Sequence, residues 1–231
     1  MLQSINKKRV YFYLLIFLLL SSVFNFNFIL KFKIINSVSH INILGLNEKE
    51  KNILEKNLEI FINKNIFLIS REEIQNRLKN NNFLDSYNII KILPSKLLVK
   101  VKKTEFVGKT ILNGEKFYIG KNGKLTKTFL VKREYNLPQV FGSFEVNEFL
   151  KLRESLNSNG FNINKIKKYY YYKSNRWDIE NEDYVVFKLP SKNLDKSLKN
   201  YKSLLKSNKI ITGQLIDLRM NNKIILKNEK R

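Results

Sequence analysis

A long, mostly hydrophobic block lies near the start of the chain, and Ser21, Ser22, Asn25 and Asn27 weaken its second half. Residues 10–30 carry no charged side chain, and Lys7, Lys8 and Arg9 directly precede them. A helix rises about 1.5 Å per residue, so this block would span roughly 30 Å, the thickness of the hydrocarbon layer of a bilayer. The pattern therefore predicts a transmembrane helix over residues 10–30. A cleaved signal peptide is the alternative; we favour an uncleaved anchor, because the block is long and no Ala-x-Ala-like site follows it.

The charges around this block predict its orientation. Segments rich in Lys and Arg remain in the cytoplasm, so residues 1–9 are expected to form a short cytoplasmic tail, although Lys31 and Lys33 weaken the contrast. A linker at residues 31–37 would follow the anchor. The rest of the chain is then expected to lie outside the cytoplasm, held at the inner (cytoplasmic) membrane by a single pass.

Behind the linker, the hydrophobic period changes from that of a strand to that of a helix and back. Asn47 with Glu50, and Ser70 with Glu73, have the spacing of capping boxes, in which a polar side chain and a glutamate three residues later bond each other's backbone. The predicted elements are strands at residues 38–43, 87–93 and 96–103, with helices after Asn47 and Ser70. Two helices can cover one face of a three-stranded sheet, so residues 38–105 are predicted to form a β-α-α-β-β domain.

Short strands and turns dominate residues 106–227. Apolar side chains at helical spacing predict amphipathic helices at residues 146–158 and 194–206. The strands are expected at residues 116–119, 124–128, 163–173, 176–179 and 184–189. Residues 137–142 are predicted to be a loop. The fold class is therefore α+β, with a mainly antiparallel β domain following the first domain.

The pattern closes with LIDLRMNNKIIL at residues 215–226. It reads as a strand, a tight Asn221-Asn222 turn and a second strand, before a basic tail at residues 228–231. A strand with nothing after it leaves one row of N–H and C=O groups without partners. We therefore expect an open edge at Ile224, Ile225 and Leu226, with Ile225 supplying an edge donor.

Composition narrows the possible functions. The formal net charge is +23, which would suit a nucleic-acid binder. However, lysine greatly outnumbers arginine and alanine is absent, which is the composition that an AT-rich genome produces, whereas arginine is the residue preferred for reading bases. We attribute the charge to this bias and expect no nucleic-acid partner.

Side chains suited to catalysis or metal binding are scarce. The chain has no cysteine and one histidine, His40, so thiolate chemistry, disulfides and a histidine cluster for a metal are excluded. Glu72 and Glu73 belong to the first turn of a helix, and residues 180–183 form a solvated acidic turn. The four tyrosines at residues 169–172 are expected to divide between the two faces of a strand. We expect no cofactor, no metal and no enzyme activity.

Several motifs, in this order, resemble the FtsQ/DivIB family of bacterial cell division proteins. They are Ile41-Asn42-Ile43-Leu44-Gly45-Leu46, Asn65-Ile66-Phe67-Leu68, Ile92-Leu93-Pro94-Ser95-Lys96-Leu97-Leu98-Val99, Leu137-Pro138 with Gly142, Arg176-Trp177, Lys188-Leu189-Pro190 and Asp217-Leu218-Arg219. Two features depart from the family pattern: Gly120 stands where an acidic residue is usual, and the Pro-Ala often found after the first domain is missing near Gly108. The resemblance implies that residues 38–105 are a POTRA domain and that residues 106–227 are an FtsQ-type β domain.

The resemblance also implies a function and a site. Family members are non-enzymatic scaffolds of the divisome at the septum, and they bind the coiled-coil division proteins FtsB and FtsL. By position, the partner-binding segment would comprise Met220, Asn221, Asn222, Lys223, Ile224, Ile225 and Leu226, to which a strand of FtsB would be added. Two other functions stay open: a periplasmic adapter or secretion component whose POTRA domain holds another client, and an envelope enzyme acting on peptidoglycan. The terminal strand can also be an ordinary edge protected by lysines.

Overall fold

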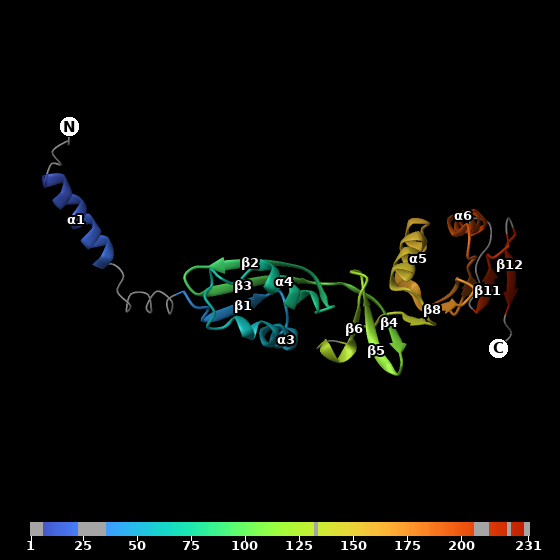
Figure 1. Cartoon of the computed structure of the whole chain (residues 1–231). Coiled ribbons are helices and arrows are strands. Elements are labelled where there is room, and N and C mark those ends of the chain that lie inside the picture. Colours follow the sequence, from blue (N-terminus) through green and yellow to red (C-terminus); the bar gives the residue numbers. More distant parts are fainter. Residues whose placement is uncertain (1–6, 23–35, 132–133, 206–212, 221–222, 229–231) are drawn as a thin grey trace, which may run out of the picture. The chain divides into compact units, whose positions relative to one another are not determined.

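The structure is a computed structural model of the chain, and Figure 1 gives its elements and their labels. It describes residues 7–22, 36–131, 134–205, 213–220 and 223–228. The chain divides into two compact units. The first comprises residues 1–46, 51–80 and 87–101, and the second comprises residues 47–50, 81–86 and 102–231.

The first helix, α1 (Lys7–Ser22), has 16 residues. Within the described ranges, no helix combines the length and the apolar character needed to cross a membrane. The predicted anchor at residues 10–30 continues past α1 into residues 23–30, which lie outside the described part of the chain.

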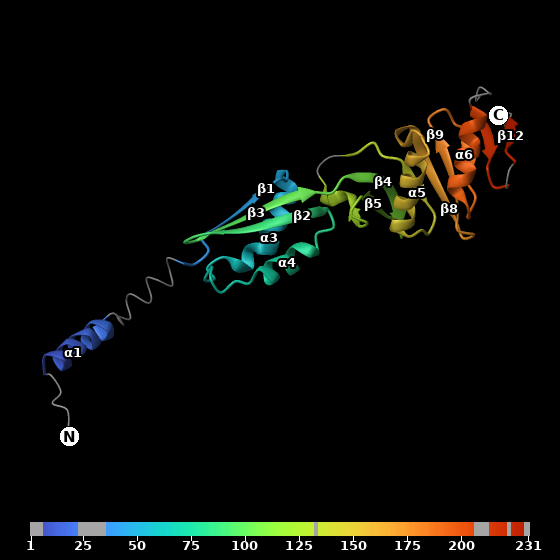
Figure 2. The same ribbon diagram turned by 90° about the horizontal axis from the view of Figure 1, so that it is seen from above.

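Residues 38–105 have the predicted β-α-α-β-β order. Their sheet has three strands in the order β1-β3-β2, and β1 runs parallel to β3. The elements are β1 (His40–Leu44), α3 (Glu48–Leu58), the short 3-10 helix η1 (Glu59–Phe61), α4 (Arg71–Lys79), β2 (Leu84–Ile92) and β3 (Lys96–Lys103). Helices α3 and α4 lie on the same face of the sheet (Figure 2). Leu54, Leu58, Ile74 and Leu78 are fully buried there, together with Leu97 and Val99 from β3.

The two predicted capping boxes have different outcomes. At α4, Glu73 N–H donates to Ser70 Oγ over 3.0 Å and Ser70 N–H donates to the Glu73 carboxylate over 3.2 Å, so that box is complete. At α3, Glu50 N–H donates to Asn47 Oδ1 over 3.3 Å. The Glu50 carboxylate, which is buried, instead contacts Lys103 Nζ. The capping box at α3 is therefore only half formed, because the carboxylate of Glu50 forms an ion pair with Lys103.

The second unit is built on a nine-stranded sheet in the order β12-β11-β10-β9-β8-β7-β4-β5-β6. Its strands are β4 (Phe106–Leu112), β5 (Glu115–Gly120), β6 (Leu125–Lys127), β7 (Gln139–Phe141), β8 (Ile166–Tyr172), β9 (Arg176–Asn181), β10 (Val186–Lys188), β11 (Gln214–Asp217) and β12 (Ile225–Asn228). Its helices are α5 (Val146–Ser158) and α6 (Leu194–Leu205), with short 3-10 turns η2 (Thr128–Leu130) and η3 (Ile163–Lys165). Five of the strand pairings are antiparallel and three are parallel.

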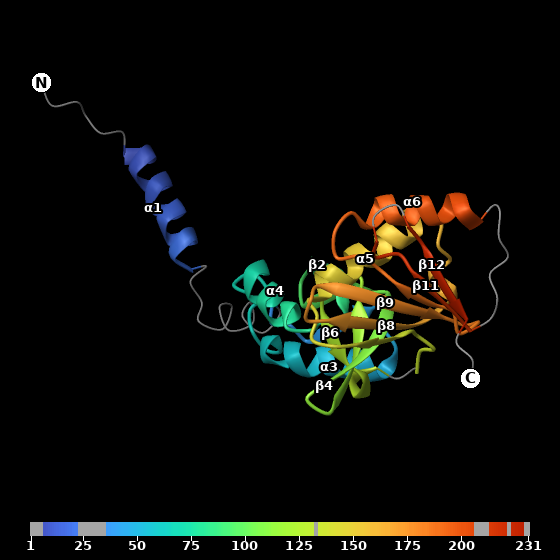
Figure 3. The ribbon, with the colours of Figure 1, turned by 90° about the vertical axis from the view of Figure 1, so that its right-hand side faces the viewer.

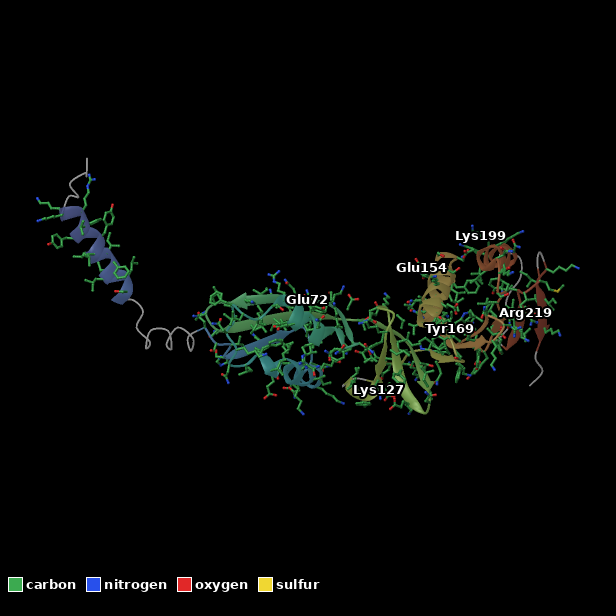
Figure 4. The ribbon with its side chains drawn as sticks, in the orientation of Figure 1. Glu72, Lys127, Glu154, Tyr169, Lys199 and Arg219 are labelled. Atoms are coloured by element: carbon green, nitrogen blue, oxygen red, sulfur yellow. The ribbon has the colours of Figure 1, made fainter. Side chains whose placement is uncertain are left out.

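Helices α5 and α6 cover one face of this sheet (Figure 3). Phe149, Leu152 and Leu156 recur along α5 at helical spacing, and all three are buried. Tyr169 of β8 lies beneath α5 (Figure 4), with its ring centroid 5.0 Å from that of Phe149. Tyr170 instead stacks on Phe141 at 5.0 Å. The tyrosines are thus divided between the two faces, as their alternation predicts.

The predicted loop at residues 137–142 is wrong. Gln139–Phe141 forms β7, which pairs in parallel with β4 on one side and with β8 on the other. Three residues are too few to display a period, and the strand exists because neighbours distant in sequence bond both of its edges. This strand joins the β4-β5-β6 part of the sheet to the β8–β12 part.

Candidate partner-binding strand edge

Strand β12 lies at one end of the nine-stranded sheet. It pairs antiparallel with β11, from Asp217 opposite Ile225 to Gln214 opposite Asn228. Of the strands in the described residues, β11 is the only one that pairs with β12. One row of peptide groups of β12 therefore faces away from the sheet.

The connection to β12 is longer than the predicted two-residue turn. Because Asp217 pairs with Ile225, residues 218–224 lie between the two strands. Asn221 and Asn222 fall outside the described residues. Ile224 precedes the strand, is half-buried and packs against the core of the second unit. Of the predicted edge residues Ile224, Ile225 and Leu226, only the last two belong to β12.

The hydrogen bonds of β11 show which peptide groups of β12 are free. Leu218 N–H donates to Lys188 O of β10 over 2.9 Å. Peptide groups alternate in direction along a strand, so Ile216 also faces β10, whereas Leu215 and Asp217 face β12.

The same alternation then applies to β12. Ile225 lies opposite Asp217 and Lys227 lies opposite Leu215, so the peptide groups of both residues bond β11. Leu226 and Asn228 turn theirs to the open edge. The expectation that Ile225 supplies an edge donor is therefore wrong, because the register gives that role to Leu226. The sequence analysis also omitted Lys227 and Asn228, whose place in the strand only the register reveals.

The side chains beside the open edge are apolar and basic. Met220, Ile225 and Leu226 are 51%, 36% and 48% exposed, and Lys223 and Lys227 are exposed. A cavity of about 430 Å³ adjoins this end of the sheet. It is lined by Lys188, Leu215, Asp217, Arg219, Met220, Ile225 and Lys227.

A row of charged residues runs across the sheet into this cavity. Asp178, Lys188 and Asp217 are paired in register on β9, β10 and β11, and residues so paired share one face. Arg219, shown in Figure 4, donates from Nε to Asp217 Oδ1 over 2.8 Å. This side-chain hydrogen bond lowers the pKa of Asp217. Burial raises the pKa of Asp178, and the Arg176 guanidinium opposes that rise.

The candidate catalytic groups of the sequence are engaged elsewhere. His40 is exposed, and its Nδ1 lies 2.9 Å from Ser39 Oγ. Glu180 accepts from Lys168 Nζ over 3.0 Å, and Glu182 pairs with Lys165 over 2.7 Å, which lowers the pKa of Glu182. In the described part of the chain, no group of three or more His, Cys, Asp or Glu residues is placed to hold a metal.

The outward row of peptide groups on β12 suits the addition of a further strand.

Two family models match the chain. The model described as "POTRA domain, FtsQ-type" matches residues 36–103. The model described as "Cell division protein FtsQ/DivIB, C-terminal" matches residues 111–219. Together they span most of the sequence, and the chain belongs to the FtsQ/DivIB family of cell division proteins. The second match ends at Arg219 and therefore does not include the segment from Met220 to Leu226.

Two FtsQ proteins of Rickettsia agree with this assignment. The chain is similar to the cell division protein FtsQ of Rickettsia bellii, with 29% identity over 161 residues that cover 68% of this chain and 60% of that protein. For FtsQ of Rickettsia felis the identity is 26% over 183 residues, covering 76% and 68%. The chain thus spans 60% of the length of the first relative. The extracytoplasmic domain of DivIB from Geobacillus stearothermophilus is a solved structure with TM-score 0.31 and 13% identity, covering 47% of this chain and 99% of that one.

Proposed function

We propose that this protein is a non-enzymatic scaffold of the bacterial divisome. A single N-terminal helix would anchor it in the cytoplasmic membrane, with the bulk of the chain outside the cytoplasm at the septum. Strand β12 would receive a strand from a coiled-coil division protein of the FtsB type, within an FtsB/FtsL complex. The observation that carries the proposal is the single-sided pairing of β12 within the described sheet.

The register suggests how the partner strand would be held. Leu226 and Asn228 turn their peptide groups outward, and each main-chain hydrogen bond would contribute about 0.5–1.5 kcal/mol. Main-chain bonds of this kind provide affinity in strand addition, and alternate side chains provide specificity. The lysines beside the edge favour a partner with acidic side chains, although exposed ion pairs contribute only about 0–1 kcal/mol each.

The test is to replace Leu226 with proline. Proline has no N–H and is tolerated on edge strands where that N–H faces solvent. Leu226→Pro should therefore weaken binding of the FtsB/FtsL complex by up to about tenfold and visibly reduce its pull-down, while the pairing of β12 with β11 persists. Leu226→Ala is the matched control, since it also removes the side chain but keeps the N–H, and it should retain most of the binding.

Folding is checked by circular dichroism and by the fluorescence of Trp177, the only tryptophan of the chain. Ile225→Pro is a further comparison, because it removes a donor that faces β11 and should destabilise the terminal strands themselves. Full binding of the partner complex by a folded Leu226→Pro protein would refute the proposed mode of binding.

A further inference from the structure

At one end of the first unit, three separate segments of the chain are joined. Ile66 N–H donates to Asn36 O over 2.8 Å, and Ser39 N–H donates to Ser95 O, in the turn between β2 and β3, over 2.9 Å. Figures 1 and 2 both show this turn at the end of the unit where the chain leads into β1. Residues 36–39, 64–69 and 91–96 thus form one end of the first unit, which we call the linker end.

The linker end exposes large hydrophobic side chains. In the described part of the first unit outside α1, six such side chains are exposed, and this end holds Phe67, Leu68, Ile92 and Leu93. Leu68 is 82% exposed and Leu93 is 58% exposed. Lys91 Nζ donates to Ile69 O, so the two pairs belong to adjoining segments. Single exposed apolar residues are ordinary on a protein surface, whereas a group of them marks contact with a protein or a membrane.

The loop that carries Phe67 and Leu68 has a defined shape. Asn65 Oδ1 accepts from Phe67 N–H, and Asn65 O accepts from Leu68 N–H, each over 3.0 Å. Ile66, within the same turn, is fully buried. Because a turn of this kind fixes the local backbone, the turn itself holds the two hydrophobic side chains outward.

The charges at the linker end have one sign. Residues 36–46, 60–71 and 87–101 contain no Asp or Glu, although the chain has 20 of them. Glu72 and Glu73 follow in the first turn of α4, where the Glu73 carboxylate accepts from Ser70 N–H. Lys64 and Lys96, each close in sequence to one of the apolar pairs, are exposed. An apolar surface bordered by lysines is suited to the interface of an anionic bilayer.

The linker end is also close in sequence to the predicted anchor. Only residues 31–35 separate Asn36 from the hydrophobic block at residues 10–30, and an extended chain of that length spans at most about 20 Å. An anchor in the bilayer would therefore hold this end of the first unit within reach of the bilayer surface, which favours lipid over a protein partner.

We propose that the linker end binds the surface of the anionic bilayer in which the protein is anchored. Lys64 and Lys96 contact the phospholipid headgroups, and the side chains that enter the interface are Phe67, Leu68, Ile92 and Leu93. The inference rests on the membrane anchor of the proposed function, because the anchor brings this end to the bilayer. It does not depend on the partner strand proposed for β12.

The test uses the full chain in vesicles of phosphatidylcholine with about 30% phosphatidylglycerol. The chain has no cysteine, so a fluorescent probe can be attached at Leu18→Cys, Leu44→Cys, Leu68→Cys or Leu93→Cys. Nitroxide groups high on the lipid acyl chains quench a probe in the interface, and iodide quenches a probe in water. The probes at residues 68 and 93 should be quenched by the lipid and shielded from iodide. The reverse is expected at Leu44, which is 45% exposed at the opposite end of β1.

Further substitutions test the two kinds of contact, with the probe at residue 93 reporting the ratio of docked to free protein. Leu68→Asp should lower this ratio at least about tenfold, and Leu44→Asp should leave it unchanged. Lys64→Gln and Lys96→Gln should each lower it about fivefold in the anionic vesicles, and neither should change it in phosphatidylcholine alone. All four side chains are exposed, and circular dichroism checks that each variant is folded.

The probe at residue 18 separates this inference from the anchor. Lipid quenching there without quenching at residues 68 and 93 would overturn the inference and leave the anchor in place. Quenching at residues 68 and 93 alone would support the lipid contact and contradict the anchor, and no quenching at any of the three would overturn both.

Two other results would also overturn the inference. If the probes at residues 68 and 93 are shielded from both quenchers, protein covers them, such as a second copy of the chain. If the lipid quenches the probes at residues 44 and 93 equally, the linker end has no preference for the bilayer.

Discussion

Gly108 of β4 is a position where one added methyl group tests the packing of the second unit. A Cβ atom there would lie 3.2 Å from Ile119 Cδ1, from Phe149 Cζ and from Val140 Cγ2. Optimal carbon–carbon contacts are about 3.5–4.0 Å. All three neighbours are almost fully buried, so none can move aside into solvent.

The expected cost follows from two opposing effects. Overpacking a close-packed core costs about 1–3 kcal/mol, and exchanging glycine for alanine recovers about 0.4–1 kcal/mol by restricting the unfolded chain. Gly108→Ala should therefore lower the free energy of unfolding by about 1.5 kcal/mol. Shortening one neighbour should relieve the clash. In the Phe149→Leu background the same change should cost about 1 kcal/mol less, a coupling between residues in contact.

Urea unfolding followed by the fluorescence of Trp177 is the assay. Trp177 is the only tryptophan and is 8% exposed in the same core. Gly114→Ala is the control, since its Cβ would meet no atom within 4 Å but its φ is +78°. That variant should lose stability through backbone strain, and Phe149→Leu should not change the loss. A Gly108→Ala protein as stable as the parent, or strict additivity with Phe149→Leu, would refute the packing argument.

Two further predictions concern single hydrogen-bonding groups. Burial raises the pKa of the Tyr169 phenol to about 12, with Arg153 opposing the rise; its contribution to stability is therefore complete below a pH of about 10, the unfolded pKa, and is lost as the pH rises through about 12. Tyr169→Phe should remove about 1.4 kcal/mol of the stability lost between about pH 9 and pH 11 in urea titrations, and an unchanged loss would contradict this. Ser70→Ala deletes the acceptor of Glu73 N–H and should cost about 1 kcal/mol in thermal melts followed by circular dichroism, whereas Ser70→Asp should cost much less; equal costs would exclude the cap as the cause.

Elements specified by nearby residues were predicted well. The helix expected at residues 146–158 is α5 (Val146–Ser158), because its apolar positions and its stop near Gly160 are both local signals. The box at Ser70 formed for the same reason. At Glu50 the prediction failed, because Lys103, distant in the sequence, competes for the carboxylate. β7 was missed, since its two partners, β4 and β8, lie outside any sequence window.

The sequence by itself determined the α+β class, the β-α-α-β-β order of the first domain and the family resemblance, all of which follow from periodicity, caps and motifs written along the chain. The tertiary structure alone decided which peptide groups are left without partners. Alternation in the sequence tells which side chains share a face, but the direction of an N–H depends on the register with the next strand. That register turns the peptide groups of Leu226 outward and those of Ile225 toward β11.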